Sequence, residues 1–252
     1  MIRLHHSLLV MALAAVLSLT SEAKENRRMS QSIVTAAAPD TLDARQRAII
    51  PVAASAAAGD LVKLNTSLNE GLDAGMTVSD AREILVQLYA YAGFPRSLNA
   101  LSELMKVLEA RKQRGIQDAP GSEPTRPIPK GDALLEAGTA NQTTLSGGPV
   151  EGPLFDFAPA ANEYLRAHLF GDIFERDNLD WQSRELATVG MLSALPGADS
   201  QLQAHMRISM NVGITVSQLR QVDQVLAERV DADIARRAGE ALTRHLATMT
   251  EK

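Results

Sequence analysis

The sequence predicts an all-α protein built as a tandem helical repeat, and three observations support this. Aromatic residues make up only 4% of the 252 residues, and alanine and leucine dominate the apolar 45%. This composition favours closely packed helices over a β-sandwich, whose strands prefer β-branched and aromatic residues. Apolar residues recur at three- and four-residue spacing, and no segment shows the sustained alternation typical of strands. The third observation is an internal repeat.

The same residue pattern occurs twice along the chain. Leu42-Asp43-Ala44-Arg45-Gln46-Arg47 aligns with Leu179-Asp180-Trp181-Gln182-Ser183-Arg184, and, once Pro196 is skipped, Gly59 aligns with Gly197 and Thr77-Val78-Ser79 with Thr215-Val216-Ser217. A repeat of this kind indicates one supersecondary unit used twice.

The two copies differ at two positions that bear on chemistry. Ala48 of the first copy corresponds to Glu185 of the second, and Ser67 corresponds to His205. The second copy therefore carries two side chains capable of proton transfer that the first copy lacks.

The N-terminus has the pattern of a secretory signal over residues 1–23. Arg3 supplies the positive charge, Leu8 to Leu19 is apolar, and Ser21-Glu22-Ala23 offers small residues for cleavage. The apolar stretch is short for a hydrocarbon layer of about 30 Å; the alternative is an uncleaved N-terminal anchor. We therefore expect a periplasmic or secreted protein, with no membrane contact after cleavage, and a flexible leader over residues 24–40.

The first repeat is expected over residues 41–115. Four helices are predicted: residues 42–58, a second between the cap Asp60 and Gly75, 81–92 and 96–114. Pro51 should kink or interrupt the first of them. Gly93-Phe94-Pro95 should separate the third from the fourth.

A linker or crossover is expected over residues 116–156, because Gly, Pro, Thr and Ser dominate there and the periodicity vanishes. The second repeat is expected over residues 157–252. Its predicted helices are residues 158–170, 181–195, 200–212, 217–228 and 232–249.

Charge and cysteine content exclude several functions. The net charge of −5 provides no basic face, which argues against a nucleic-acid partner. The absence of cysteine excludes disulfides, thiolate metal sites and thiol peroxidase chemistry. The three histidines that follow the signal lack the spacing of metal ligands, and neither a GxGxxG motif nor a P-loop is present. No metal or other cofactor is expected.

Two segments together resemble a known family. The run from Glu83 to Leu101 (EILVQLYAYAGFPRSLNAL) is similar to the signature EVLLH…YAGFPAALNAL, and the run from Arg184 to Gly213 is similar to RELVTVA…PQLxxHxxxALNxG. Both signatures are those of the carboxymuconolactone decarboxylase family, relatives of the alkyl hydroperoxidase D-type proteins. The resemblance implies an all-α fold of the alkyl hydroperoxidase D-like type and association into a homotrimer or a hexamer-like assembly.

The redox chemistry of the hydroperoxidase branch is absent from this chain. That branch uses Cys-x-x-Cys followed by a histidine four residues later. Counted back from His205, those positions hold Ala198 and Gln201, and in the first copy they hold Asp60 and Lys63. A disulfide-cycling peroxidase is therefore excluded on chemical grounds.

His205 and Glu185 are the candidate catalytic residues. An imidazole can give or take a proton near neutral pH, and a carboxylate that faces it can orient it or shuttle the proton. The alternatives are a hydrogen-bonded helix histidine and an acid placed by the helix dipole or by an ion pair with Arg184 or a neighbouring subunit.

Four residues are candidates for substrate binding: Arg96, Asn99, Tyr91 and Arg184. Arg96 begins a helix and can clamp a carboxylate bidentately, although a solvated surface arginine is the commoner outcome. Asn99 lies one turn further on, and Tyr91 is expected in the core with its hydroxyl near a polar partner. Arg184 recurs as Arg47, which favours a structural pairing between the repeats.

These residues suggest one composite pocket for each pair of repeats. Glu185 and His205 would come from the second copy, and the segment from Tyr91 to Asn99 of the first copy, from the same or an adjacent subunit, would form a wall.

The function that the resemblance implies is decarboxylation of a small carboxylated lactone, with His205 and Glu185 transferring the proton. The signal argues for a different substrate, because catabolism of aromatic-derived lactones is normally cytoplasmic. The alternatives are a non-catalytic helical oligomer that binds a small carboxylated ligand or serves as a scaffold, and a cysteine-independent peroxidase-like or isomerase activity.

Overall fold

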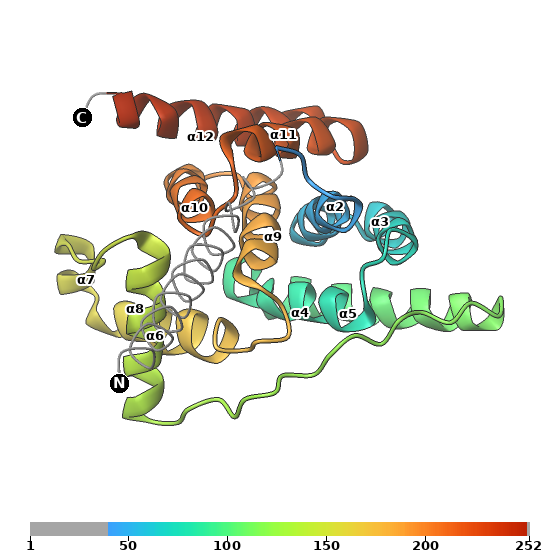
Figure 1. Ribbon diagram of the computed structural model, residues 1–252, viewed down its shortest axis with the longest axis horizontal. Helices are drawn as coiled ribbons and strands as arrows, with labels where there is room; N and C mark the ends of the chain where they lie inside the picture. The colour runs from blue at the N-terminus through green and yellow to red at the C-terminus, as the bar shows by residue number, and fades with distance from the viewer. Residues whose placement is uncertain (1–39, 251–252) are drawn as a thin grey trace, which may run out of the picture. The chain divides into compact units, whose positions relative to one another are not determined.

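The computed structural model describes residues 40–250, so the expected signal and nearly all of the expected leader lie outside the described residues. Every regular element in the described part of the chain is a helix, and the predicted all-α fold is confirmed (Figure 1). None of these helices combines the length and the apolar character needed to cross a membrane.

Each repeat contributes four helices in the same order. They are α2 (Ala44–Ala58), α3 (Leu61–Asp73), α4 (Val78–Gln87) and α5 (Tyr89–Gln113) in the first copy, and α9 (Trp181–Ser193), α10 (Asp199–Asn211), α11 (Val216–Arg229) and α12 (Ala232–Thr250) in the second.

The repeated sequence motifs are helix caps. Asp43 and Asp180 accept hydrogen bonds from the backbone N–H groups three residues later and begin α2 and α9. Thr77 and Thr215 begin α4 and α11 in the same way. These side chains satisfy N–H groups that a helix start leaves unpaired, and so fix where each helix begins.

The two expected helix breaks have different outcomes. Gly93 has φ 81° and ψ 161°, so it interrupts the helical backbone inside α5 as predicted. The prediction that Pro51 could interrupt its helix was wrong, because α2 continues through this residue from Ala44 to Ala58. Pro51 is buried, and packing around the whole helix holds it together across one missing hydrogen bond.

The segment between the repeats contains more helix than the sequence predicted. It holds α6 (Asp132–Ser146), α7 (Pro153–Phe157), α8 (Pro159–Tyr164) and a π-helix, η1 (Leu165–Ile173). Helix α6 was not predicted, because it buries only Gly138, Gln142 and Leu145, and these residues give no apolar periodicity. A Cβ on Gly138 would lie 1.9 Å from the Arg166 carbonyl oxygen, so α6 packs on η1 through a backbone contact.

The core of the fold is the contact between α2 and α9. Every residue is buried from 48 to 57 on α2 and from 183 to 193 on α9. The two helices lie side by side (Figure 1). A Cβ on Gly190 would lie 2.9 Å from the Ile50 carbonyl oxygen and 3.3 Å from the Ala53 Cβ. Ala53 and Gly190 are equivalent positions of the two copies. Equivalent residues that touch in this way indicate that the repeats are related by a pseudo-twofold axis at this crossing.

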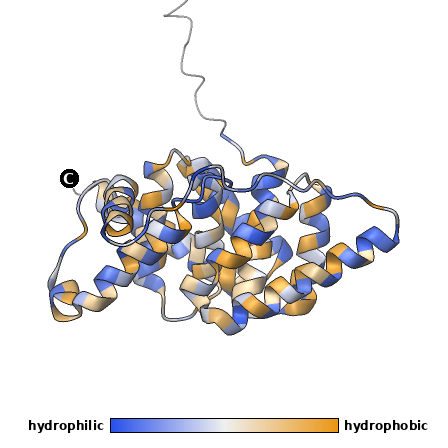
Figure 2. Cartoon of the chain, turned by 90° about the horizontal axis from the view of Figure 1, so that it is seen from below, coloured by the Kyte–Doolittle hydropathy of each residue, from blue (hydrophilic) through white to orange (hydrophobic). Residues whose placement is uncertain are grey.

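Hydrophobic (orange) and hydrophilic (blue) residues occur together along the helices in Figure 2. On α12 the buried apolar residues are Ile234, Ala235, Ala238, Ala241 and Leu242. Their spacing of three and four residues is that of one helix face turned to a core.

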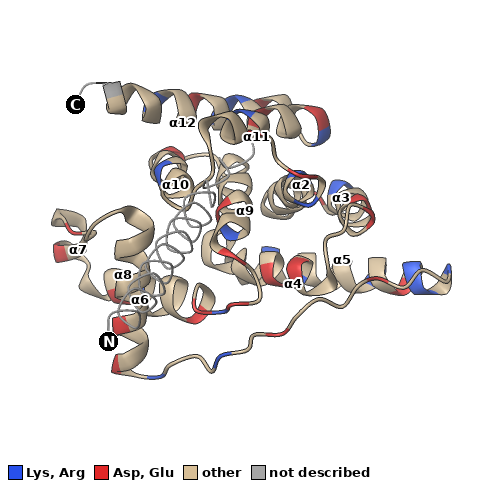
Figure 3. Cartoon of the chain, in the orientation of Figure 1, with Lys and Arg blue, Asp and Glu red and all other residues tan. Residues whose placement is uncertain are grey.

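A buried ion cluster also joins the repeats. Arg184 of α9 is fully buried, and its guanidinium lies 3.1 Å from a carboxylate oxygen of Glu83 on α4. Arg176 donates two further hydrogen bonds to Glu83, of 2.9 and 2.7 Å. Figure 3 shows charged residues on both α9 and α4, the helices that this cluster joins.

The cluster determines the ionisation of its acid. Burial alone would raise the pKa of Glu83, but the hydrogen bonds from Arg176 and the charge of Arg184 outweigh it and lower the pKa to about 2. Glu83 therefore stays ionised and compensates a buried arginine.

The crossing of α2 and α9 predicts that Gly190→Ala destabilises the protein. The added methyl would press on the Ile50 carbonyl, and overpacking of this kind costs about 1–3 kcal/mol. Urea denaturation of the two proteins measures the difference. Gly148→Ala is the matched control, because its Cβ would meet nothing within 4 Å. Equal midpoints for wild type and Gly190→Ala would show that the helices do not need this close approach.

The ion cluster predicts a specific pH dependence of stability. The pKa of the Glu83 carboxyl is about 2 in the folded protein, whereas a glutamate in an unfolded chain has a pKa of about 4.3. The ionised carboxylate therefore stabilises the fold at pH values above about 4.3, and this contribution disappears as the pH falls toward 2. At pH 7, Glu83→Gln should cost about 3–5 kcal/mol, because it leaves Arg184 buried without its carboxylate. The difference in unfolding free energy between wild type and Glu83→Gln should shrink between about pH 4.5 and 2. Glu70→Gln, which removes a half-exposed ion pair with Arg229, is the control. A pH-independent difference would contradict the assignment.

Candidate functional site

Glu185 and His205 form a direct pair in the second repeat. Glu185 lies on α9 and His205 on α10, and His205 Nδ1 lies 2.8 Å from Glu185 Oε2. Glu185 is fully buried, and the His205 side chain is 10% exposed. When Glu185 is ionised its carboxylate can only accept, and the shared proton then lies on His205 Nδ1. Nε2 has no hydrogen-bond partner among residues 40–250 and is the nitrogen left for chemistry.

Two buried side-chain oxygen atoms of α9 and α10 have no hydrogen-bond partner among the described residues. Glu185 Oε1 is buried without a partner, and so is Oγ of Ser209, one turn after His205 on the same helix. A buried acceptor of a charged group costs free energy unless a donor reaches it. Glu185 Oε1 therefore needs a hydrogen-bond donor, which a water molecule or a polar ligand would supply. Ser209 was not among the predicted site residues, although its spacing of four residues from His205 places both on one helix face.

Tyr91 of the first repeat lies against this pair. Its ring meets the His205 ring edge-on, with 5.9 Å between the centroids and 76° between the planes. Burial raises the pKa of the Tyr91 phenol, and the nearby Glu185 charge raises it further. The phenol is therefore neutral and can donate a hydrogen bond. Its oxygen lies 3.3 Å from Oγ1 of Thr188.

A chain of buried polar groups connects Tyr91 to the ion cluster. Gln87 Nε2 donates to Thr188 Oγ1 over 2.8 Å and to the Arg184 carbonyl over 3.1 Å, and Arg184 donates back to Gln87 Oε1 over 3.2 Å. Gln87 and Thr188 were not among the predicted site residues. Gln87 lies inside the apolar segment that precedes Tyr91, and a side-chain amide in such a segment indicates a buried hydrogen-bonding role. The chain fixes the position of Tyr91 beside His205.

The other predicted binding residues lie elsewhere. Arg184 is fully buried in the ion cluster and has no surface with which to meet a substrate. Arg96 donates to the Ala57 carbonyl over 3.0 Å, where its guanidinium closes the end of α2 above Gly59. Asn99 is exposed on α5. Of the expected first-copy wall, Tyr91 is the residue that the structure places in contact with the pair.

The equivalent place in the first repeat is filled by apolar atoms. Gly71 corresponds to Ser209, and a Cβ there would meet Met76 Cε at 3.1 Å and Ala48 Cβ at 3.7 Å. Met76 is itself only 2% exposed. Its flexible side chain occupies space that the second repeat gives to polar groups. The copies thus share a backbone and differ in what their interiors hold.

The remaining histidines of the described region lie apart from the pair. His168 on η1 lies 2.7 Å from Asp172 and is about half exposed. His245 lies on α12, close to Arg207. Within residues 40–250, no three His, Asp or Glu side chains gather in a way that could hold a metal ion.

Comparison with known families agrees with the repeat and with the resemblance of its two signatures. The sequence model of the carboxymuconolactone decarboxylase family matches the chain twice, over residues 25–105 and 159–245. The first match begins inside the expected leader, and the unmatched part between the two contains the expected linker. No curated protein matches the chain. Together the two matches cover more than half of the sequence and fall on the two repeats, so the chain belongs to the carboxymuconolactone decarboxylase family.

Proposed function

We propose that the protein is a proton-transfer enzyme, a carboxy-lyase that acts on a small carboxylated lactone at the Glu185–His205 pair. The 2.8 Å contact between His205 Nδ1 and Glu185 Oε2 is the observation that carries this proposal. It orients an imidazole with a buried carboxylate and leaves Nε2 unpaired, an arrangement suited to general acid–base chemistry.

In the proposed reaction the substrate loses CO2 by cleavage of a carbon–carbon bond. The electron pair of that bond stays on the substrate carbon, delocalised toward the lactone carbonyl. His205, protonated at both nitrogens, delivers the Nε2 proton to the carbon and returns to the neutral form. The Glu185 carboxylate stabilises the imidazolium before transfer, and solvent restores the proton afterwards.

Two further features support a polar organic substrate. The unpartnered Glu185 Oε1 can accept a hydrogen bond from a substrate hydroxyl or from a bridging water. Tyr91 carries a neutral phenol beside His205 and can donate to a substrate oxygen on which charge develops. Arg96, the residue expected to clamp a substrate carboxylate, places its guanidinium at the end of α2 instead.

The test is a carboxymuconolactone decarboxylation assay in D2O that follows both CO2 release and deuterium at the product carbon. His205→Gln should lower kcat about 10²–10⁴-fold, the usual contribution of a general acid. Glu185→Gln should lower it less, because the imidazole remains. Ser67→Ala, at the equivalent position of the first copy, should leave the rate unchanged.

Circular dichroism and thermal melting should accompany each variant, so that a lost fold is not mistaken for lost chemistry. A folded His205→Gln protein with the wild-type rate would remove His205 from the mechanism. A wild-type protein that binds lactones without turnover would overturn the lyase proposal and favour the non-catalytic binding protein.

A further inference from the structure

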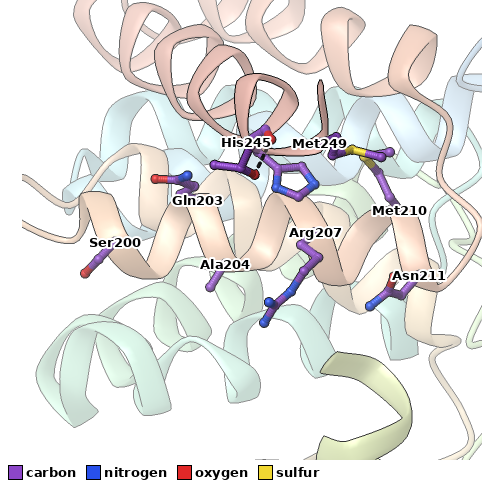
Figure 4. A pocket seen from close by; sticks show the side chains of 9 residues that line it. Ser200, Gln203, Ala204, Arg207, Met210, Asn211, His245 and Met249 are labelled. Carbon is purple, nitrogen blue, oxygen red and sulfur yellow. Dashed lines mark hydrogen bonds between the residues drawn. The ribbon is translucent and has the colours of Figure 1, made fainter. Parts of the chain in front are cut away.

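A hollow lies between α10 and α12, on a different side of α10 from His205. It has a volume of about 610 Å³, within the usual range of small-ligand sites. Gln203, Arg207 and Asn211 line it from α10, and His245 and Met249 line it from α12 (Figure 4). The α10 residues follow helical spacing and form one face. Leu202, His205, Met206 and Ser209 form the buried face that turns to the core.

The hollow contains a cation without a counter-ion. Arg207 is exposed, and it forms no ion pair or hydrogen bond with any of residues 40–250. None of the lining residues that the structure describes is acidic. An arginine fork presents five N–H donors and matches a carboxylate bidentately. A carboxylate therefore matches the hydrogen-bonding groups that Arg207 presents in this hollow.

His245 adds a buried polar group aimed into the same space. Its residue is 8% exposed, its ring lies between α12 and α10 in Figure 4, and its ring nitrogens have no hydrogen-bond partner in the described part of the chain. Burial lowers the pKa of His245, and the positive charge of Arg207 lowers it further. Near pH 7 the ring is a neutral imidazole, able to give one hydrogen bond and accept another.

The remaining lining determines the size and polarity of the ligand. Met210 and Met249 offer flexible apolar contacts beside Arg207 and His245, and Met249 is 52% exposed. A bare inorganic ion would leave these methionines unused, whereas a carboxylate on a short apolar body would contact both parts.

We propose that this hollow binds a small organic carboxylate with an apolar body, held by Arg207 through the carboxylate, by His245 through one hydrogen bond, and by Met210 and Met249 through its apolar part. The site is separate from the Glu185–His205 pair and does not depend on the reaction proposed there.

The test measures binding of benzoate and hexanoate to the full protein by isothermal titration calorimetry, with benzyl alcohol and sulfate as the uncharged and inorganic counterparts. Arg207→Gln should weaken benzoate binding about tenfold or more, the loss expected for a hydrogen-bonded charge. Arg220→Gln removes the same charge from an exposed arginine that does not line this hollow and should leave the affinity unchanged. His205→Gln should also bind as the wild type does.

Several results would overturn the proposal. The proposal fails if neither benzoate nor hexanoate binds, or if benzyl alcohol binds as tightly as benzoate. It also fails if sulfate competes for the site as well as benzoate does, or if Arg207→Gln binds benzoate with the wild-type affinity. Benzoate binding lost in His205→Gln but kept in Arg207→Gln would place the carboxylate at the Glu185–His205 pair instead. Met249→Gln, at a half-exposed position outside the core, should weaken hexanoate binding more than acetate binding, and equal losses would contradict the apolar contact.

Discussion

The close crossing of α2 and α9 is the constraint on which the rest of the structure depends. Two helices can approach until one backbone nearly touches the other only where a side chain is missing, and Gly190 supplies that position against Ile50 and Ala53. Because both helices are buried all round, each must be covered by helices from both repeats. This crossing fixes the relative positions of the helix caps, the ion cluster and the polar chain to Tyr91.

The site illustrates how a core of helices can carry polar chemistry. Glu185, Thr188 and Arg184 all lie on α9 and are fully buried, yet each faces a different neighbour. Arg184 meets a carboxylate, Thr188 meets an amide and a phenol, and Glu185 meets an imidazole. Arg184 is paired through both terminal nitrogens, to Gln87, Glu83 and the Arg176 carbonyl, and only its Nε lacks a partner among the described residues, so its role is structural. Glu185 keeps a carboxylate oxygen unpaired next to an imidazole, and this placement marks it as the functional candidate.

Much of the fold follows from local signals in the sequence. The sequence predicted Asp60 as a helix cap, and the structure confirms it, because a side chain and a backbone N–H three residues apart suffice to make a cap. The partnership of Glu185 with His205 was expected because both differ from the first copy at aligned positions. In contrast, α6 and the role of Arg96 depend on distant backbone, the first on η1 and the second on the end of α2. No local pattern encodes such contacts, so the sequence could not place them.

The pairing of distant segments has a consequence for how the chain folds as it is made. The bond between Arg184 and Glu83 joins residues 101 positions apart, and α2 finds its main neighbour in the second repeat. When the first repeat leaves the ribosome, its alanine-rich central helix has no α9 to pack on, and α4 has an acid without its arginines. The first half must therefore wait, incompletely covered, until synthesis of the second half is nearly finished. A delay of that kind favours chaperone binding to the nascent chain and exposes it to pairing with the wrong copy.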